Sequence, residues 1–118
     1  MNREIIKSDR APDPIGPYSQ AVRACGLIFC SGQIPLDPDT DEIVGEGDVR
    51  RQTKRVMDNI AAILDAAGST LSRSVKATIY LTDLNDFDDV NEVYSNYFEN
   101  TTPPARTCIQ VAALPKGA

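Results

Sequence analysis

A long amphipathic stretch between residues 48 and 67 constrains the fold more than any other feature of this sequence. Asp48 stands at a typical N-cap position, and Gly68 stands where a chain commonly leaves a helix. We therefore predict a helix over 48–67, roughly 30 Å long, with one face that must be buried. That face repeats at steps of three and four residues and consists of Val49, Thr53, Val56, Met57, Ile60, Ile63, Leu64 and Ala67.

Short stretches on both sides of this helix predict strands. Two strand-like runs, Gln20–Cys25 and Leu27–Ser31, are joined by a Cys-Gly pair that is typical of a tight hairpin turn. Polar and apolar residues alternate again over 75–81 and over Ala105–Val111. The sequence therefore predicts two paired strands before the helix and two more strands after it.

A second helix is expected between the last two strands. Asp86 is expected to cap it, and Asp88 and Asp89 in its first turn favour the helix dipole. Its predicted apolar face consists of Phe87, Val90, Val93, Tyr94, Tyr97 and Phe98. Residues 8–19, which hold three prolines, and residues 32–47 predict loops.

The resulting order is β-β-α-β-α-β in one domain, residues 1–118. We predict an α/β (α+β) fold in which two helices cover one face of a single small mixed sheet. The other face still carries apolar side chains because every strand alternates, and the sequence offers no third helix to cover it. An exposed apolar sheet face is typical of an interface, so we expect a homo-oligomer.

The charge balance disfavours nucleic acid as a partner. The chain has 12 basic and 17 acidic residues, whereas binding to phosphates requires a clustered basic face. The one basic cluster, formed by Arg50, Arg51, Lys54 and Arg55, is interpreted as a solvated face of the first helix. We also expect no membrane span, because the sequence has no run of about 18 apolar residues.

Missing residue types exclude several kinds of chemistry. A sequence without histidine has no His-based triad and lacks the ligands of most zinc sites. Its three cysteines form no Cys-x-x-Cys pair, and no phosphate-binding or dinucleotide-binding glycine motif is present. We expect no metal, no cofactor and no disulfide. The thiols and the lack of an apolar leader predict a cytoplasmic protein.

The strand 105–111 carries the most informative polar residue. Its alternation places Arg106, Cys108 and Gln110 on one face. A partly buried guanidinium must be paired, and it suits a carboxylate through two parallel hydrogen bonds. Two interpretations stay open from these residues: a salt bridge to one of the 17 acidic residues of this chain, and a bound carboxylate.

Other candidate residues are less specific. Cys108 is either a nucleophile or a small buried side chain, and no histidine is available to activate it. Ser31 and Gly32 follow a strand and offer a hydroxyl and backbone amides to a ligand, although Ser-Gly also commonly ends a strand. Tyr18 offers either an aromatic wall or a packing contact, and Asn91 either a ligand contact or a local one.

Four motifs, taken together, resemble the reactive intermediate deaminase A (RidA, YjgF-like) family, and they span residues 8 to 116. The resemblance implies a chorismate mutase-like fold and a homotrimer with three clefts between subunits. The motifs are Ile15–Ala21, Phe29–Pro35, Asp83–Phe87 and Pro104–Cys108.

The resemblance also implies an activity. Members of the family hydrolyse 2-imino acids and their enamine tautomers, such as 2-aminoacrylate and 2-aminocrotonate, to 2-keto acids and ammonia without a cofactor. These intermediates leak from pyridoxal phosphate enzymes, which implies a functional link to such enzymes. Matched to the family, Arg106 binds the substrate carboxylate and Cys108 is the second candidate catalytic residue. Tyr18, Ser31, Gly32 and Asn91 match substrate-binding positions of the same cleft.

The end of the sequence departs from this pattern. The family has a further strand with a glutamate that positions the attacking water, and Ala118 precedes any counterpart. We expect that the printed sequence is truncated; the other explanation is a member that lacks the strand.

The alternative function is a non-catalytic module that binds small carboxylates such as keto acids in the same cleft. A third candidate, an RNA-cleaving relative, is disfavoured by the acidic balance and the lack of histidine.

Overall fold

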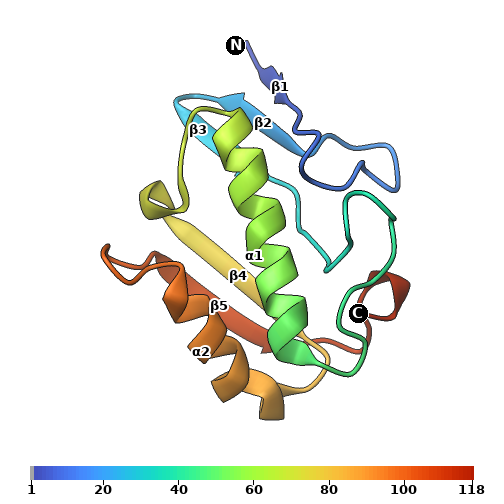
Figure 1. Ribbon diagram of the computed structural model, residues 1–118. Coiled ribbons are helices and arrows are strands. Elements are labelled where there is room, and N and C mark those ends of the chain that lie inside the picture. Colours follow the sequence, from blue (N-terminus) through green and yellow to red (C-terminus); the bar gives the residue numbers. More distant parts are fainter. Residues whose placement is uncertain (1) are drawn as a thin grey trace.

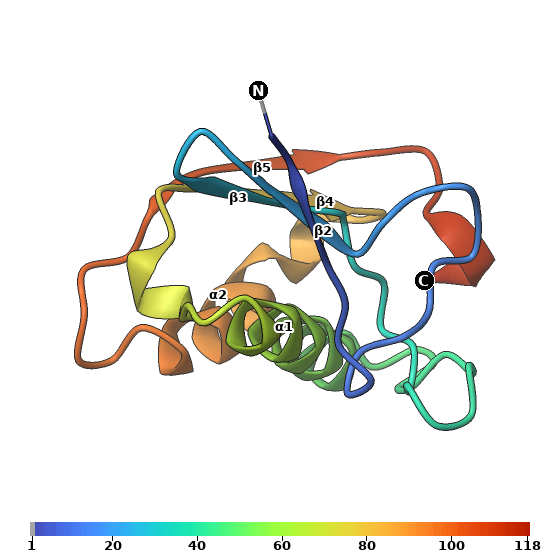
Figure 2. The ribbon, with the colours of Figure 1, turned by 90° about the horizontal axis from the view of Figure 1, so that it is seen from above.

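The computed structural model describes residues 2–118, and its strands lie in one layer with both long helices on one side (Figures 1 and 2). This confirms the predicted fold class. The elements in chain order are β1 (Glu4–Ile6), β2 (Ala21–Ala24), β3 (Leu27–Cys30), α1 (Val49–Ala66), η1 (Leu71–Arg73), β4 (Lys76–Leu81), η2 (Leu84–Asp86), α2 (Phe87–Asn96), β5 (Ala105–Gln110) and η3 (Pro115–Gly117).

The sequence predicted a single mixed sheet, but hydrogen bonds divide the strand layer into two parts. Strands β1, β2 and β3 form an antiparallel meander, whereas β4 and β5 pair in parallel from Lys76↔Ala105 to Leu81↔Gln110. Within residues 2–118, no named strand of one part pairs with a strand of the other. Contacts outside the strand ladders must therefore hold the two parts together.

Strand β1 was not predicted from the sequence. It is three residues long and pairs with β2, and its last residue, Ile6, is buried. A three-residue strand is too short to show a period of two. It is identified only in the structure, by its pairing with the distant strand β2.

Asp86 occupies the N-cap position of the second helix as predicted, but the expected capping hydrogen bond is not formed. The Asp86 side chain makes no capping hydrogen bond, because the 3₁₀ turn η2 runs directly into α2. Instead, the Asp83 carboxylate accepts a hydrogen bond from the Asn85 backbone N–H at 2.9 Å and caps that turn. The first helix agrees with its prediction, since Asp48 accepts hydrogen bonds from Arg50 and Arg51 N–H and Gly68 has a φ of 74°.

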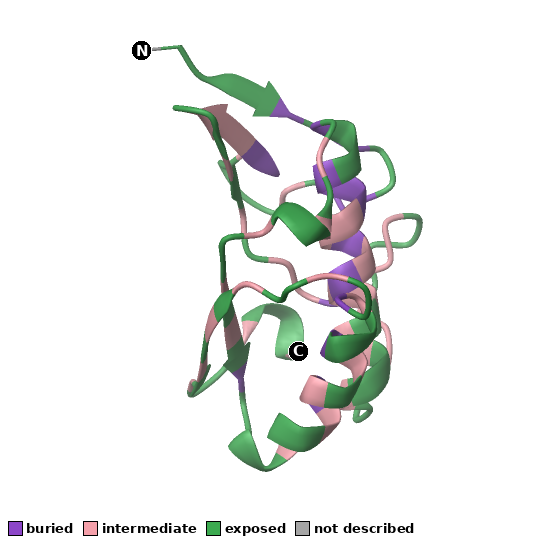
Figure 3. Cartoon of the chain, turned by 90° about the vertical axis from the view of Figure 1, so that its left-hand side faces the viewer, coloured by how far each residue is buried: buried purple, intermediate pink, exposed green. Residues whose placement is uncertain are grey.

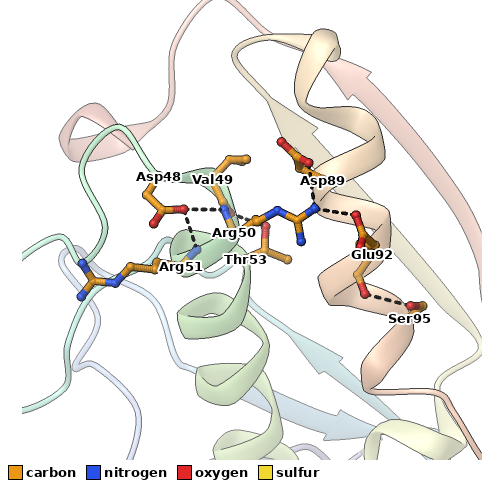
Figure 4. A network of polar contacts seen from close by, with 8 residues as sticks. All are labelled: Asp48, Val49, Arg50, Arg51, Thr53, Asp89, Glu92 and Ser95. Atoms are coloured by element: carbon orange, nitrogen blue, oxygen red, sulfur yellow. Dashed lines mark hydrogen bonds and ion pairs between the residues drawn. The ribbon is translucent and has the colours of Figure 1, made fainter.

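Two of the four residues in the basic cluster on α1, Arg50 and Lys54, have acidic partners. Arg50 reaches across to α2, where its guanidinium contacts both Asp89, at 2.9 Å, and Glu92 (Figure 4). Lys54 pairs with Asp58 one turn along the same helix. These exposed ion pairs contribute little stability individually, but they reduce the clustered positive charge that binding to phosphates requires. Arg51 and Arg55 form no ion pair within residues 2–118.

Helix α1 supplies side chains to two separate apolar clusters, and the buried residues gather where it meets the strands (Figure 3). Ile63 lies in a cluster with Ile6 and Ala21 of the antiparallel part. Met57, two turns earlier, packs with Tyr94 of α2, with Phe98 just after that helix and with Ile79 of β4. Helix α1 therefore joins the two parts of the strand layer.

A buried asparagine on α1 fixes the loop over residues 32–47. Asn59 is 0% exposed. The sequence did not predict this burial, although Asn59 lies among apolar positions of α1. Its amide donates to the Leu36 carbonyl at 3.0 Å, and its oxygen accepts a hydrogen bond from the Arg55 side chain at 3.1 Å.

A buried glutamine holds the N-terminal arm in the same way. The Gln20 side chain is 3% exposed, and its oxygen accepts a hydrogen bond from Ser8 N–H at 2.6 Å. Its amide donates to the carbonyls of Ser8, Ala11 and Pro12 at 2.9–3.3 Å. One side chain thus satisfies most of the backbone polar groups of a segment that forms no ladder of its own.

The strand face opposite the helices is apolar and uncovered, as predicted. Ile28 and Ile79 pack toward the helices, so their alternating neighbours point the other way. The large apolar side chains exposed on this face include Leu27 (50%), Phe29 (59%), Tyr80 (51%) and Ile109 (42%).

No helix among residues 2–118 is both long and apolar enough to span a membrane.

We predict that Gln20→Leu lowers the free energy of unfolding by about 2–4 kcal/mol, because it leaves several buried backbone groups of the arm without partners. Urea denaturation followed by circular dichroism measures the change. Gln33→Leu is the matched control, since Gln33 makes one 3.3 Å hydrogen bond in a partly buried setting, and a loss below about 1 kcal/mol is expected. Equal stability of both variants would contradict the assigned role.

Candidate functional site

Strand β5 turns its arginine and its cysteine toward α2. Arg106 and Cys108 are opposite Ala77 and Ile79 in the parallel ladder, and both are partly buried. Gln110, next on the same face, accepts a hydrogen bond from the Leu84 N–H at 2.9 Å. This confirms the predicted orientation of the strand.

The Arg106 guanidinium lies over two aromatic rings of α2. Its central carbon is 5.4 Å from the centre of the Phe87 ring and 5.0 Å from that of the Tyr94 ring. Both distances are within the range of a cation–π interaction. None of the ion pairs within residues 2–118 involves Arg106, so the internal salt bridge left open by the sequence is not what holds it.

An open hollow of about 430 Å³ lies against Cys108 of β5 and the start of α2. Phe87 contributes to it and also contacts the guanidinium, so its ring links Arg106 to the wall of the hollow. Asn91 is one turn after Phe87 on α2 and is partly buried. The hollow is lined by Leu84, Asn85, Phe87, Asp88 and Cys108.

The remaining predicted residues form a second group on the N-terminal arm and at the end of β3. Tyr18 and Gly32 line a small cavity of about 20 Å³, which is about the room one water needs. The Tyr18 hydroxyl accepts a hydrogen bond from Ile15 N–H at 3.1 Å. The Ser31 hydroxyl donates to the Ser19 carbonyl at 2.6 Å, which ties the end of β3 to the arm.

Within one chain, the structure keeps these two groups apart. Arg106 and Cys108 belong with the hollow beside α2, whereas Tyr18 and Gly32 belong with the small cavity at the arm, and no residue lines both. The first group alone offers a guanidinium, a thiol and an apolar wall. A guanidinium in such a set is chemically suited to a small carboxylate. Within residues 2–118, no cluster of three or more His, Cys, Asp or Glu side chains could hold a metal ion.

Phe87 and Tyr94 were not recognised as site residues from the sequence. Their periodicity marked them only as part of the apolar face of the second helix, and Phe87 is in fact 38% exposed. A possible signal was the spacing of seven residues, which puts both rings on one helix face, opposite a strand with an arginine.

Tyr94 has an unusual polar environment. The residue is 8% exposed, and its buried hydroxyl has no hydrogen-bond partner in the described residues. Burial raises the pKa of the Tyr94 phenol, and the positive charge of Arg106 offsets part of that rise. Burial thus favours the neutral form of the hydroxyl, which makes no hydrogen bond within residues 2–118.

Comparison with known protein families gives one extensive match. The model of a family described as Endoribonuclease L-PSP matches residues 8–118. The match includes both groups of candidate site residues.

Individual relatives are similar over nearly the whole chain. A RutC family protein of Pyrococcus abyssi is 55% identical over 98% of this chain and 90% of its own length. The crystal structure of the Rid family protein YyfA from Yersinia pestis has a TM-score of 0.95 at 46% identity, covering 98% of this chain and 91% of that one. The structure of Escherichia coli TdcF with bound serine has a TM-score of 0.92 at 46% identity, covering 97% and 90%.

We predict that Tyr94→Phe leaves the free energy of unfolding unchanged or raises it by up to about 1 kcal/mol, because it removes a buried hydroxyl without a partner. Tyr97→Phe, at the C-cap of the same helix, is the matched control. Its hydroxyl donates to the Asp58 carboxylate at 2.7 Å and lies 3.2 Å from the Lys54 carbonyl, so its loss should cost about 1–1.5 kcal/mol. Denaturant unfolding of both variants tests this, and a larger loss for Tyr94→Phe would show that its hydroxyl has a partner after all.

Proposed function

Because the chain belongs to the Endoribonuclease L-PSP family, which includes the RutC and Rid proteins it matches, we propose that it hydrolyses reactive 2-imino and 2-enamino acids to 2-keto acids and ammonia. The substrates we propose are small acids such as 2-aminoacrylate and 2-aminocrotonate. The observation that carries the proposal is the Arg106 guanidinium, which is partly buried over two rings and has no acidic partner in residues 2–118.

Two relatives support this choice of chemistry. One curated relative, at 46% identity, is named "Putative reactive intermediate deaminase TdcF". The same Escherichia coli protein has been solved with bound serine, a small molecule that carries a carboxylate. An arginine that lacks an internal partner suits such a carboxylate through two parallel, charge-assisted hydrogen bonds.

The proposed reaction requires little from the protein beyond orientation. The carbon of a C=N bond is already electrophilic, so water adds to it, a proton reaches the nitrogen, and ammonia leaves as the C=O bond forms. In our proposal, Arg106 binds the carboxylate and presents that carbon, while Cys108 and Asn91 line the cleft around it. Fixing the substrate in this way lowers the barrier through proximity rather than through a covalent intermediate.

We further propose that a homotrimer completes the site. The uncovered apolar face of the strand layer supports an assembly of copies. Assembly would bring Tyr18, Ser31 and Gly32 of one protomer to the cleft that holds Arg106 and Cys108 of the next. This accounts for the separation of the two groups within one chain.

The bound serine also favours a second candidate function, in which the cleft binds small carboxylates without turnover. Release of ammonia from freshly generated imine distinguishes the two functions. The family description names an endoribonuclease, but this activity is less well supported for this chain. The chain has a net charge of −5, and Arg50 and Lys54 are already paired with acidic residues.

The cellular setting is part of the proposal. We propose that the protein acts in the cytoplasm. There it would act beside pyridoxal phosphate enzymes that release imino acids.

We predict that Arg106→Ala lowers kcat/KM for 2-iminobutyrate at least about tenfold with the fold retained, because the substrate loses a charge-assisted partner. The imine is supplied by a threonine dehydratase, and ammonia or 2-ketobutyrate is measured. Arg73→Ala, which removes an exposed arginine in η1, is the control and should match the wild type. Full activity of Arg106→Ala would refute the assignment.

We predict that the wild type sediments as a trimer at micromolar concentration and that Phe29→Asp shifts it toward the monomer. Phe29 is 59% exposed on the uncovered face, where a carboxylate would be buried by assembly at a large desolvation cost. Asn96→Asp adds the same charge on the helix side and should leave the trimer intact. A monomeric wild type would contradict the proposed assembly.

A further inference from the structure

We propose that Phe87 and Tyr94 are positioning residues, whose rings hold the Arg106 guanidinium in the orientation in which it binds the substrate carboxylate. This inference rests on the proposed function and adds two residues to it. Its basis is the contact of one guanidinium with two rings, at 5.4 Å and 5.0 Å from their centres.

Arg106 needs something to hold it. Its side chain is long, and its strand, β5, pairs on one side only among the named strands, with β4. Acidic partners hold Arg10, Arg23 and Arg50, but none holds Arg106 within residues 2–118. A flexible guanidinium would lose much of its binding free energy in becoming ordered on each binding event.

Aromatic rings can hold the guanidinium without occupying its hydrogen-bond donors, whereas a carboxylate cannot. A ring attracts the cation through the face of its π system, and the contact uses none of the five N–H donors of the guanidinium. An internal carboxylate would occupy those donors and neutralise the charge. The contact with Phe87 and Tyr94 therefore immobilises the cation and leaves its donors for an acid from outside.

The two rings contribute differently. Tyr94 is 8% exposed and packs against Phe98, with ring centres 4.9 Å apart, and against Met57, so its ring is fixed in the core. Its hydroxyl has no partner, which leaves the ring as the part in contact with Arg106. Phe87 is 38% exposed and lines the hollow, so its ring faces the guanidinium at the site itself.

The test uses Phe87→Leu, because Phe87 is exposed enough for the substitution to leave the fold intact. We expect KM for 2-iminobutyrate to rise roughly three- to tenfold with kcat changed less than about twofold, which is the range of a lost cation–π contact. The Kd of 2-ketobutyrate, measured by titration calorimetry, should rise by the same factor. Phe87→Trp, the conservative variant, should restore both values because it returns an aromatic face.

Tyr97→Leu is the control. It replaces an aromatic ring at the C-cap of α2 with the same aliphatic side chain, but no cation–π contact joins Tyr97 to Arg106 among the described residues. It also removes the hydroxyl contact with Asp58, so it should lower the melting temperature and leave KM and Kd unchanged. If Tyr97→Leu raises KM as much as Phe87→Leu does, general packing explains the effect and the positioning role is wrong.

A double-mutant cycle separates positioning from direct contact with substrate. In an Arg106→Ala background, Phe87→Leu should change the Kd of 2-ketobutyrate by less than about twofold, because the group it positions is gone. If Phe87 instead touches the substrate directly, the same fold-change appears in both backgrounds, and the positioning role is overturned.

The outcomes also distinguish this inference from the proposed function. A wild type that binds 2-ketobutyrate but releases no ammonia would refute the deaminase activity, and the Kd series would still test positioning. An active wild type whose KM and Kd are unchanged by Phe87→Leu would refute positioning alone. A wild type that neither turns over the imine nor binds the keto acid would refute both.

Discussion

The burial of α1 against two separate apolar clusters is the contact on which the rest of this structure depends. Ile63 packs with the antiparallel strands, and Met57 packs with α2 and β4, while no named strand of residues 2–118 pairs across the two parts. Because the strand ladders do not fix the two parts relative to each other, the helix does so by apolar packing. The position of the arm with Tyr18 relative to Arg106 on β5 follows from this one helix.

Charge is distributed unevenly over the arginines, and this distribution indicates where the site lies. In a chain with 17 acidic residues, Arg10, Arg23 and Arg50 each lie against a carboxylate at the surface. Arg106 is partly buried, where a counter-charge would be worth most, and lies on aromatic rings instead. The carboxylate of a bound ligand would pair with the Arg106 guanidinium, and this is the physical basis of the proposed function.

The proposed assembly of copies would explain both the uncovered face of the strand layer and the division of the site into two groups. A face that exposes Phe29 and Tyr80 is costly for an isolated chain, and covering it with a second copy removes that cost. The same assembly would bring the residues of the arm to the hollow beside Phe87. Stability of the apolar face and completion of the site would then require the same contact between copies.

The sequence by itself determined the local structure: the bounds and cap of α1, the hairpin of β2 and β3, and the face of β5 that carries Arg106 and Cys108. These features depend on periodicity and on neighbouring residues, which a sequence displays directly. Only the tertiary structure decided what depends on distant partners. Examples are the pairing of β1, the burial of Gln20 and Asn59, and the shift of capping from Asp86 to Asp83. It also decided that Phe87 and Tyr94, which the sequence marks only as apolar helix residues, lie under the guanidinium, because that contact joins two elements whose separation along the chain carries no periodic signal.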